Sequence, residues 1–233
     1  MIKLPLAGTD KTVSINPSKI IAVGLNYKEH VLESKNFDKK EIVIPKEPVL
    51  FAKTVNVLAG PNDPIVIPAH IEDYKYLDAR VDPECELAII IGRKGRHIPE
   101  EKAFEYVLGY TCFNDVSQRN IQMGDPSGWF RGKSFDTFGP IGPVVVSHKD
   151  IGDPQNLKIT CKINGVVKQS ANTSEMIFSI PVLIAYISKQ FTLEEGDIIA
   201  TGTPAGISPI VPGDIVEVEV EKIGILKNPV VAE

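Results

Sequence analysis

Acidic side chains beside two apolar runs are the first feature of this chain that could do chemistry. Glu84 and Glu86 flank Cys85 at the start of the apolar run 87–91. Because residues two apart on a strand point to the same side, the two carboxylates should converge while Cys85 faces away. Asp115 closes a second strand-like run. Three oxygen ligands without a paired His or Cys favour a hard cation, Mg²⁺ or Mn²⁺, over zinc.

The alternative is that these carboxylates are solvated surface groups, as most acidic side chains are. The run Leu87-Ala88-Ile89-Ile90-Ile91 argues against that alternative, since a continuous apolar run is typical of a buried strand. We therefore interpret the three acids as a divalent-metal site.

A histidine and a glutamate three residues apart offer a second piece of chemistry. His30 and Glu33 would share one face of a short helix that we expect from Tyr27 to Ser34. A carboxylate beside an imidazole orients the ring and stabilises its charged form, which suits the pair to activating water. On spacing alone, an ordinary pair on an exposed helix is the better interpretation, because such pairs are common there.

Lys133 lies in the run Arg131-Gly132-Lys133-Ser134-Phe135-Asp136, whose glycine and phenylalanine indicate a tight, partly buried turn. A cation there would balance the carboxylates and hold a substrate oxygen. A lysine taken at random would instead be exposed. Asp136 either orients Lys133 or caps the following turn, and both roles stay open.

Short motifs in a fixed order resemble the fumarylacetoacetate hydrolase family from about Lys19 to Pro229. The motifs are Gly24-Leu25-Asn26-Tyr27 with His30 and Glu33, Phe51-Ala52-Lys53, Gly60-Pro61, Glu84-Cys85-Glu86-Leu87, Gly109-Tyr110, Asn114-Asp115-Val116-Ser117 with Arg119 and Gln122, the run 131–136, Asn164-Gly165, Gly196-Asp197, Thr201-Gly202-Thr203-Pro204-Ala205-Gly206 and Gly213-Asp214.

The resemblance implies roles for ten side chains. Metal ligands would be Glu84, Glu86 and Asp115; catalytic groups would be His30, Glu33 and Lys133; substrate-binding groups would be Arg119, Gln122, Thr203 and Lys53. For Lys53 a structural ion pair is an equal alternative. The loop around Thr203 lacks the Gly-Lys-Ser/Thr ending of a nucleotide site, and it could present its amides or the Thr203 hydroxyl to a substrate carboxylate.

The activity implied by the resemblance is metal-dependent cleavage of a C–C bond in a small 2-oxo acid, with acylpyruvate hydrolysis as the leading form. A bound metal would stabilise the enolate as a Lewis acid. The alternatives are an oxaloacetate decarboxylase or a 2-hydroxyhepta-2,4-diene-1,7-dioate isomerase, neither of which needs an attacking water. A metal-binding protein that kept the scaffold without activity is a further alternative.

Strand patterns outnumber helix patterns, which predicts an α+β, mainly β fold rather than a doubly wound sheet. Strands are expected at 19–23, 157–163 and 215–220, with a hairpin turn at Asn164-Gly165. Helices are expected at 99–108, ending at Gly109, and from Ser179 to Lys189. The polar segment 34–47 is interpreted as a mobile loop. The resemblance adds a mixed β-roll, a homodimer, a short N-terminal extension at 1–18 and a catalytic domain at 19–233.

The bulk composition excludes several classes of protein. The net charge of −5, the pI near 5.5 and the lack of a basic run disfavour nucleic-acid binding. No apolar run approaches the ~20 residues of a membrane helix, and the N-terminus does not resemble a signal peptide. Three scattered cysteines do not form a disulfide framework, so a reducing cytoplasm is the expected location.

Overall fold

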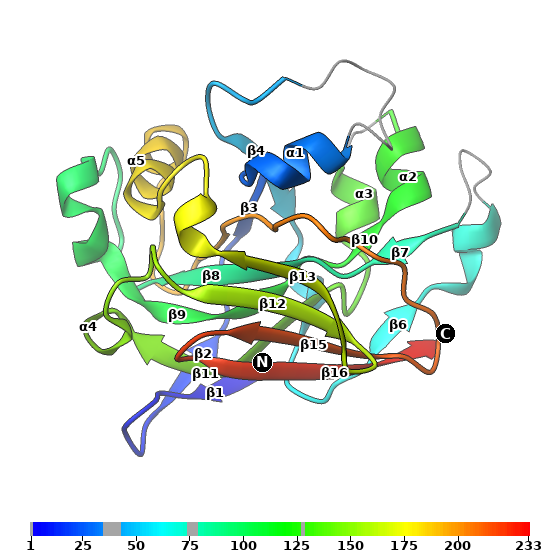
Figure 1. Ribbon diagram of the computed structural model, residues 1–233. Coiled ribbons are helices and arrows are strands. Elements are labelled where there is room, and N and C mark those ends of the chain that lie inside the picture. Colours follow the sequence, from blue (N-terminus) through cyan, green and yellow to red (C-terminus); the bar gives the residue numbers. More distant parts are fainter. Residues whose placement is uncertain (1, 35–42, 74–78, 127–128) are drawn as a thin grey trace.

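Strands dominate the computed structural model, which describes residues 2–34, 43–73, 79–126 and 129–233 (Figure 1). Within these residues a seven-stranded sheet has the order β4-β3-β14-β8-β9-β11-β5, and a five-stranded sheet has the order β13-β12-β15-β16-β6. Both sheets mix parallel and antiparallel pairs. The predicted fold class, mainly β with few helices, is confirmed.

The elements have the following bounds. The larger sheet contains β3 (Ile20–Gly24), β4 (Val49–Lys53), β5 (Leu58–Ala59), β8 (Cys85–Ile91), β9 (Val107–Asn114), β11 (Gly139–Ser147) and β14 (Ile198–Ala200). The smaller sheet contains β6 (Ile65–Ile67), β12 (Lys158–Ile163), β13 (Val166–Asn172), β15 (Ile215–Val220) and β16 (Gly224–Ala232). Two short pairs are β1 (Ile2–Pro5) with β2 (Thr12–Ile15), and β7 (Val81–Asp82) with β10 (Ser117–Gln118). The α-helices are α1 (Lys28–Ser34), α2 (Arg119–Gly124), α3 (Phe130–Lys133), α4 (His148–Ile151) and α5 (Ile180–Gln190), and the 3₁₀ helices are η1 (Val55–Val57), η2 (Ala69–Asp73), η3 (Glu100–Tyr106) and η4 (Thr173–Glu175).

Strand β8 lies at the centre of the core and is buried on both faces, as its continuous apolar run predicted. Leu87 and Ile89 pack with the inward residues of β12, β15 and β16 in one hydrophobic cluster. Ala88 and Ile90 belong to a second cluster with Leu4 of the N-terminal β1–β2 pair. Because the two faces pack in different clusters, a slip of β8 by one residue would exchange Leu87 and Ile89 with Ala88 and Ile90, and this difference favours one direction for the glutamates at its start.

Several predicted elements are present with their predicted turns and caps. Asn164 and Gly165 have φ of 52° and 77°, which a type I′ hairpin turn requires, and β13 returns antiparallel to β12. Helix α5 has Ser179 at its N-cap and a proline in its first turn. Helix α1 covers most of the predicted helix 27–34.

The predicted helix 99–108 is wrong in its type and in its end. A 3₁₀ helix spans Glu100–Tyr106, and Val107 already begins β9. Gly109 is not a helix stop: a Cβ there would lie 2.4 Å from the Val146 carbonyl oxygen, so the glycine permits close approach of β9 and β11. Of the predicted loop 34–47, residues 35–42 lie outside the described residues.

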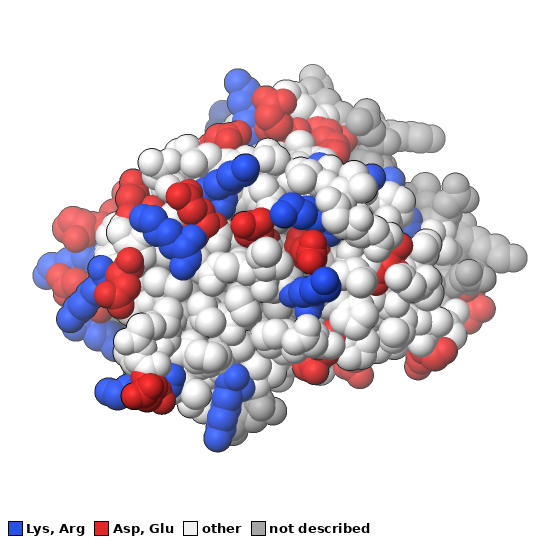
Figure 2. Space-filling view, turned by 60° about the horizontal axis from the view of Figure 1, so that its bottom comes forward, with Lys and Arg blue, Asp and Glu red and all other residues white. Residues whose placement is uncertain are grey.

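Charges of both signs alternate over the face shown in Figure 2, with no continuous basic stripe among the described residues on it. A nucleic-acid binder would be expected to show such a stripe on its binding face. In the described parts of the chain, no helix is long and apolar enough to cross a membrane.

Candidate active site

The three predicted carboxylates converge at one end of the β8–β9 pair. Antiparallel pairing places Cys85 opposite Asn114, so Glu84 and Asp115 become neighbours just beyond the ladder. The Asp115 N–H donates to the Glu84 carbonyl oxygen at 2.9 Å. One ligand oxygen from each of Glu84, Glu86 and Asp115 lies within 4.8 Å of the others, and all three side chains are buried. Cys85 packs in the hydrophobic core.

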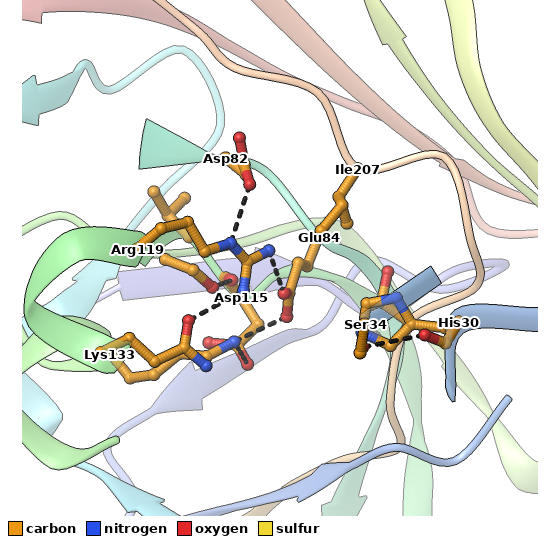
Figure 3. Close-up of polar contacts among 12 residues, drawn as sticks. His30, Ser34, Asp82, Glu84, Asp115, Arg119, Lys133 and Ile207 are labelled. Carbon is orange, nitrogen blue, oxygen red and sulfur yellow. Dashed lines mark hydrogen bonds and ion pairs between the residues drawn. The ribbon is translucent and has the colours of Figure 1, made fainter. Parts of the chain in front are cut away.

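Three buried cations surround these carboxylates, and two of them, Arg119 and Lys133, are labelled in Figure 3. The Lys133 ammonium donates to Glu84 at 2.6 Å and to Asp115 at 2.8 Å. The Arg119 guanidinium donates to the other oxygen of Glu84 at 2.5 Å. The Lys53 ammonium lies 2.6 Å from the second oxygen of Asp115. The predicted balance between Lys133 and the carboxylate cluster is therefore present.

Arg119 is held by Gln122, a predicted site residue, and by Asp82, which sequence reasoning missed. Its Nε donates to Asp82 at 2.7 Å, and its Nη1 donates to the Gln122 side-chain oxygen at 2.8 Å. Asp82 is fully buried at the end of β7, where β7 pairs with β10 directly before α2. Asp82 could be noticed in the sequence because Asp82-Pro83 directly precedes Glu84. Its partner could not be predicted from the local sequence, because Arg119 lies 37 residues away.

The pKa values of Glu84 and Glu86 are shifted in opposite directions. Burial alone would raise the pKa of Glu84, but Lys133 and Arg119 hold that pKa well below its usual range. Burial raises the pKa of Glu86, and the nearby Asp115 and Glu84 raise it further. The Gly202 N–H donates to Glu86 at 2.8 Å and opposes this only in part. A cation placed among these carboxylates would therefore stabilise the ionised form of Glu86, one of the candidate ligands.

The donor set fits a hard divalent cation. Four buried carboxylates (Asp82, Glu84, Glu86, Asp115) face three buried cations (Lys53, Arg119, Lys133), and the partly exposed Arg80 also pairs with Asp82, so the charges of the cluster balance when all are ionised. Carboxylate oxygens are the ligands that Mg²⁺ and Mn²⁺ prefer. Glu84, Glu86 and Asp115 are the residues that would hold such an ion.

His30 and Glu33 form a contact on α1. Nδ1 of His30 lies 3.3 Å from Glu33 Oε2, and His30 is 7% exposed. The Gly206 N–H donates to the Glu33 carboxylate at 3.1 Å, which fixes the glutamate from its other side. The Ser34 hydroxyl donates to the His30 carbonyl oxygen at 2.8 Å. Burial and this second anchor distinguish the pair from an ordinary surface neighbour pair.

The glycine-rich loop 201–206 holds carboxylates through its backbone. The Gly202 N–H binds Glu86 and the Gly206 N–H binds Glu33, so one loop connects the carboxylate cluster to the His30–Glu33 pair. Thr203 accepts a hydrogen bond from the Gln169 side chain at 2.7 Å. The Gly202 and Gly206 N–H groups are therefore already paired, whereas Thr203 lines the cavity and its hydroxyl stays the predicted substrate contact of this loop.

One cavity of about 130 Å³ joins these groups. Its lining consists of Val23, Gly24, Leu25, His30, Ser34, Phe51, Glu84, Glu86, Asp115, Arg119, Gln122, Met123, Trp129, Lys133, Thr203 and Ile207. Lys53 is not among the lining residues; its ammonium binds Asp115 and the Lys133 carbonyl oxygen, as the ion-pair alternative expects. Asp136 accepts from Asn56 at 2.6 Å, while Lys133 binds Glu84 and Asp115.

Lys53→Met should destabilise the protein by roughly 3–5 kcal/mol, the usual cost of removing one partner from a buried ion pair. The substitution leaves Asp115 Oδ1 without its cation, while Oδ2 keeps Lys133, and it leaves the Lys133 carbonyl oxygen without its donor. Urea unfolding without added metal measures this loss. The double variant Lys53→Met/Asp115→Asn should lose less than the sum of the single variants, because no unpaired charge remains. Additive losses would show that the pair is not coupled.

Comparison with known proteins agrees with this site. The family described as fumarylacetoacetate (FAA) hydrolase, C-terminal, matches residues 19–231. The chain belongs to this family. The mitochondrial oxaloacetate tautomerase of Xenopus laevis is 43% identical over 224 residues, which are 93% of this chain and 66% of that protein.

Two solved structures of fumarylacetoacetate hydrolase relatives share the fold. A 5-carboxymethyl-2-hydroxymuconate delta-isomerase from Mycobacterium smegmatis has a TM-score of 0.82 and 40% identity, covering 97% of this chain and 86% of that one. A maleylpyruvate hydrolase from Sphingobium sp. SYK-6, in complex with manganese(II) and pyruvate, has a TM-score of 0.76 and 35% identity, covering 93% and 71%. The family therefore includes both isomerases and hydrolases among the relatives of this chain.

Proposed function

We propose that this protein is a Mg²⁺- or Mn²⁺-dependent enzyme that interconverts the enol and keto forms of a small 2-oxo acid of the oxaloacetate type. The observation that carries this proposal is the cavity whose lining brings together the three carboxylates, Lys133 and His30, with Glu33 in contact with His30 from outside that lining. The tautomerase and isomerase relatives, whose named reactions move a proton and break no C–C bond, support it.

The proposed mechanism assigns the proton to His30. With its Nδ1–H donated to Glu33, the imidazole keeps a lone pair at Nε2, which can take a proton from the carbon next to the keto group. The same nitrogen then returns the proton to the carbon or the oxygen, and Glu33 stabilises the charged ring meanwhile. The bound metal would supply Lewis-acid stabilisation of the enolate.

Other side chains of the cavity bind and orient the substrate in this proposal. Lys133 uses two of its N–H groups on Glu84 and Asp115, which leaves a third for a substrate oxygen. Gln122 accepts from Arg119 through its oxygen, so its amide N–H₂ is the part that can donate to substrate. Arg119 itself acts mainly by fixing Glu84 and Gln122.

Acylpyruvate hydrolysis is the second candidate, because the same His30–Glu33 pair could activate water. Water would add to the acyl carbonyl, the C–C bond would break, and pyruvate would leave as its enolate, yielding a carboxylic acid and pyruvate. The maleylpyruvate hydrolase relative supports this candidate.

Two parallel assays test these proposals. Enol oxaloacetate and acetylpyruvate are each given to the protein with Mn²⁺, with Mg²⁺ and with EDTA. We expect a metal-dependent loss of the enol absorbance of oxaloacetate. Release of acetate and pyruvate from acetylpyruvate would favour the hydrolase. Activity on neither substrate would contradict both proposals.

We also propose a homodimer formed along β4. Among the described residues β4 is the outer strand of the larger sheet, beside an apolar groove of about 560 Å³. Val55 and Phe191 line this groove and are 49% and 47% exposed. Light scattering should give about twice the 25.5 kDa of one chain. Phe191→Asp should halve that mass, whereas Val167→Asp, at a residue that is 52% exposed on β13, should leave it unchanged.

A further inference from the structure

One wall of the cavity is built around Trp129, the chain's one tryptophan. The six-membered ring of Trp129 lies directly on Gly24, at the end of β3: a Cβ on Gly24 would lie 2.3 Å from Trp129 Cζ3 and 2.8 Å from Cη2. The backbone of Gly24 is not in the left-handed region that favours glycine. The glycine is therefore required by the ring that packs on it rather than by its own dihedral angles.

Phe51 holds the same ring from β4. The rings of Phe51 and Trp129 have centroids 5.2 Å apart at an interplanar angle of 76°, an edge-to-face contact. Phe51 pairs with Ala22 on β3, two residues before Gly24, so both contacts come from adjacent strands of the sheet. A ring that packs on two adjacent strands cannot swing aside without breaking both contacts.

The position of Trp129 is also linked to that of Lys133. Trp129 is the N-cap of α3, and its carbonyl oxygen accepts the Lys133 N–H at 3.1 Å. The Lys133 ammonium lies 5.2 Å from the Phe51 ring centroid, within the range of a cation–π contact. The apolar wall and the polar end of the cavity are thus parts of one short helix and the strand beside it.

The cavity that results is small for an enzyme site. Its volume of about 130 Å³ compares with the ~300–1,000 Å³ of pockets that hold drug-sized ligands. The carboxylates, Lys133 and His30 occupy one part of the lining, while Phe51, Trp129 and Met123 supply apolar surface. The part of a substrate that extends from the reacting carbons toward this wall has little room.

We propose that Trp129 determines which substrates this site accepts, by limiting the group beyond the reacting carbons to a short one. This inference rests on the proposed function, since it concerns 2-oxo acids at the same site. The substrates it admits carry a group the size of a carboxylate or an acetyl, and those it excludes carry an aryl group or a long acyl chain.

Calorimetric binding of a graded series of 2-oxo acids tests this proposal without relying on turnover. Pyruvate, 2-oxobutyrate, 2-oxovalerate and phenylpyruvate are titrated into the Mn²⁺-loaded wild type, Trp129→Phe and Trp129→Ala. In the wild type we expect the affinity to fall along the series. One additional methylene group against a closed apolar wall changes the preference between two ligands by about 10- to 200-fold. In Trp129→Ala the ratio of phenylpyruvate affinity to pyruvate affinity should be about tenfold higher than in the wild type, or more. In Trp129→Phe this ratio should lie between those of the wild type and Trp129→Ala. The same ratio in all three proteins would overturn the proposal.

Gly24 provides an independent test of the wall. Gly24→Ala should weaken pyruvate binding about tenfold or more, because the new methyl group displaces the Trp129 ring, and Gly24→Ala/Trp129→Ala should recover most of that loss. Circular dichroism checks that each variant folds. If Gly24→Ala binds pyruvate as tightly as the wild type, the proposal that Trp129 packed on Gly24 forms the wall of the cavity is wrong. A size-dependent series without catalysis would instead contradict the proposed function alone, whereas failure of the wild type to bind pyruvate would overturn both.

Discussion

Glu86→Gln should abolish metal binding and activity, yet make the metal-free protein more stable. The loss of metal affinity should exceed the ~10–100-fold cost of changing a group that only supports a ligand. The gain in stability follows because Glu86 is buried beside Asp115 and Glu84, so its ionised form opposes folding when no cation is near. About 1 kcal/mol of added stability would raise the melting temperature by ~2–4 °C for a chain of this size.

The stability difference between Glu86→Gln and the wild type should depend on pH, and the pKa shift of Glu86 determines its direction. Burial, with Asp115 and Glu84, raises the pKa of Glu86 in the folded, metal-free state above the ~4.3 of an unfolded chain. The folded state therefore binds the proton more tightly, and this contribution is fully present below pH ~4.3 and lost as pH rises through the folded pKa. The Glu86→Gln variant should lack this loss, so its advantage over wild type should grow with pH.

Glu33→Gln is the matched control for Glu86→Gln. It makes the same chemical change near the same cavity at a residue that is not a proposed ligand, so Mn²⁺ affinity measured by calorimetry should stay near that of the wild type. Melting curves with EDTA and with Mn²⁺ complete the comparison. Wild-type Mn²⁺ affinity in Glu86→Gln would show that the three carboxylates do not form the metal site.

Local rules were sufficient to predict the carboxylate cluster. The two-residue period of a strand places Glu84 and Glu86 on one side, and the end of the neighbouring strand adds Asp115. Both rules hold because the two faces of β8 pack in different clusters, so a slip by one residue would exchange the side chains that fill them.

Contacts between distant segments could not be predicted in this way. Gly202 binds Glu86 across 116 residues, and Gly206 binds Glu33 across 173. The role of Trp129 was not visible in the local sequence, since its ring meets Gly24 only through the packing of segments that are far apart in the chain. The error at 99–108 has a similar cause: sheet pairing along β9 outweighed a helical pattern that looked sufficient by itself.

His30→Ala and Glu33→Ala should each slow enol–keto interconversion by about 10²–10⁴-fold, the usual contribution of general acid–base catalysis. In His30→Ala no imidazole remains to carry the proton. In Glu33→Ala the ring loses the partner that orients it, and the Gly206 N–H loses its acceptor. Hydrolysis of acetylpyruvate, where present, should fall by a similar factor, because it needs the same pair to activate water. Decarboxylation of oxaloacetate should suffer less, since it needs neither an activated water nor a proton abstracted from carbon.

Binding measurements separate this role from a structural one. Neither residue is a proposed metal ligand, so affinities for Mn²⁺ and for oxalate, an enolpyruvate mimic, should remain near those of the wild type. Glu29→Ala is the control on the same helix, because Glu29 is exposed and does not line the cavity. If His30→Ala and Glu33→Ala keep the wild-type rate on both substrates, α1 serves only to cover the cavity. Proton transfer would then need another group lining that cavity, and Lys133 would be the first to test, because its ammonium lies among the carboxylates.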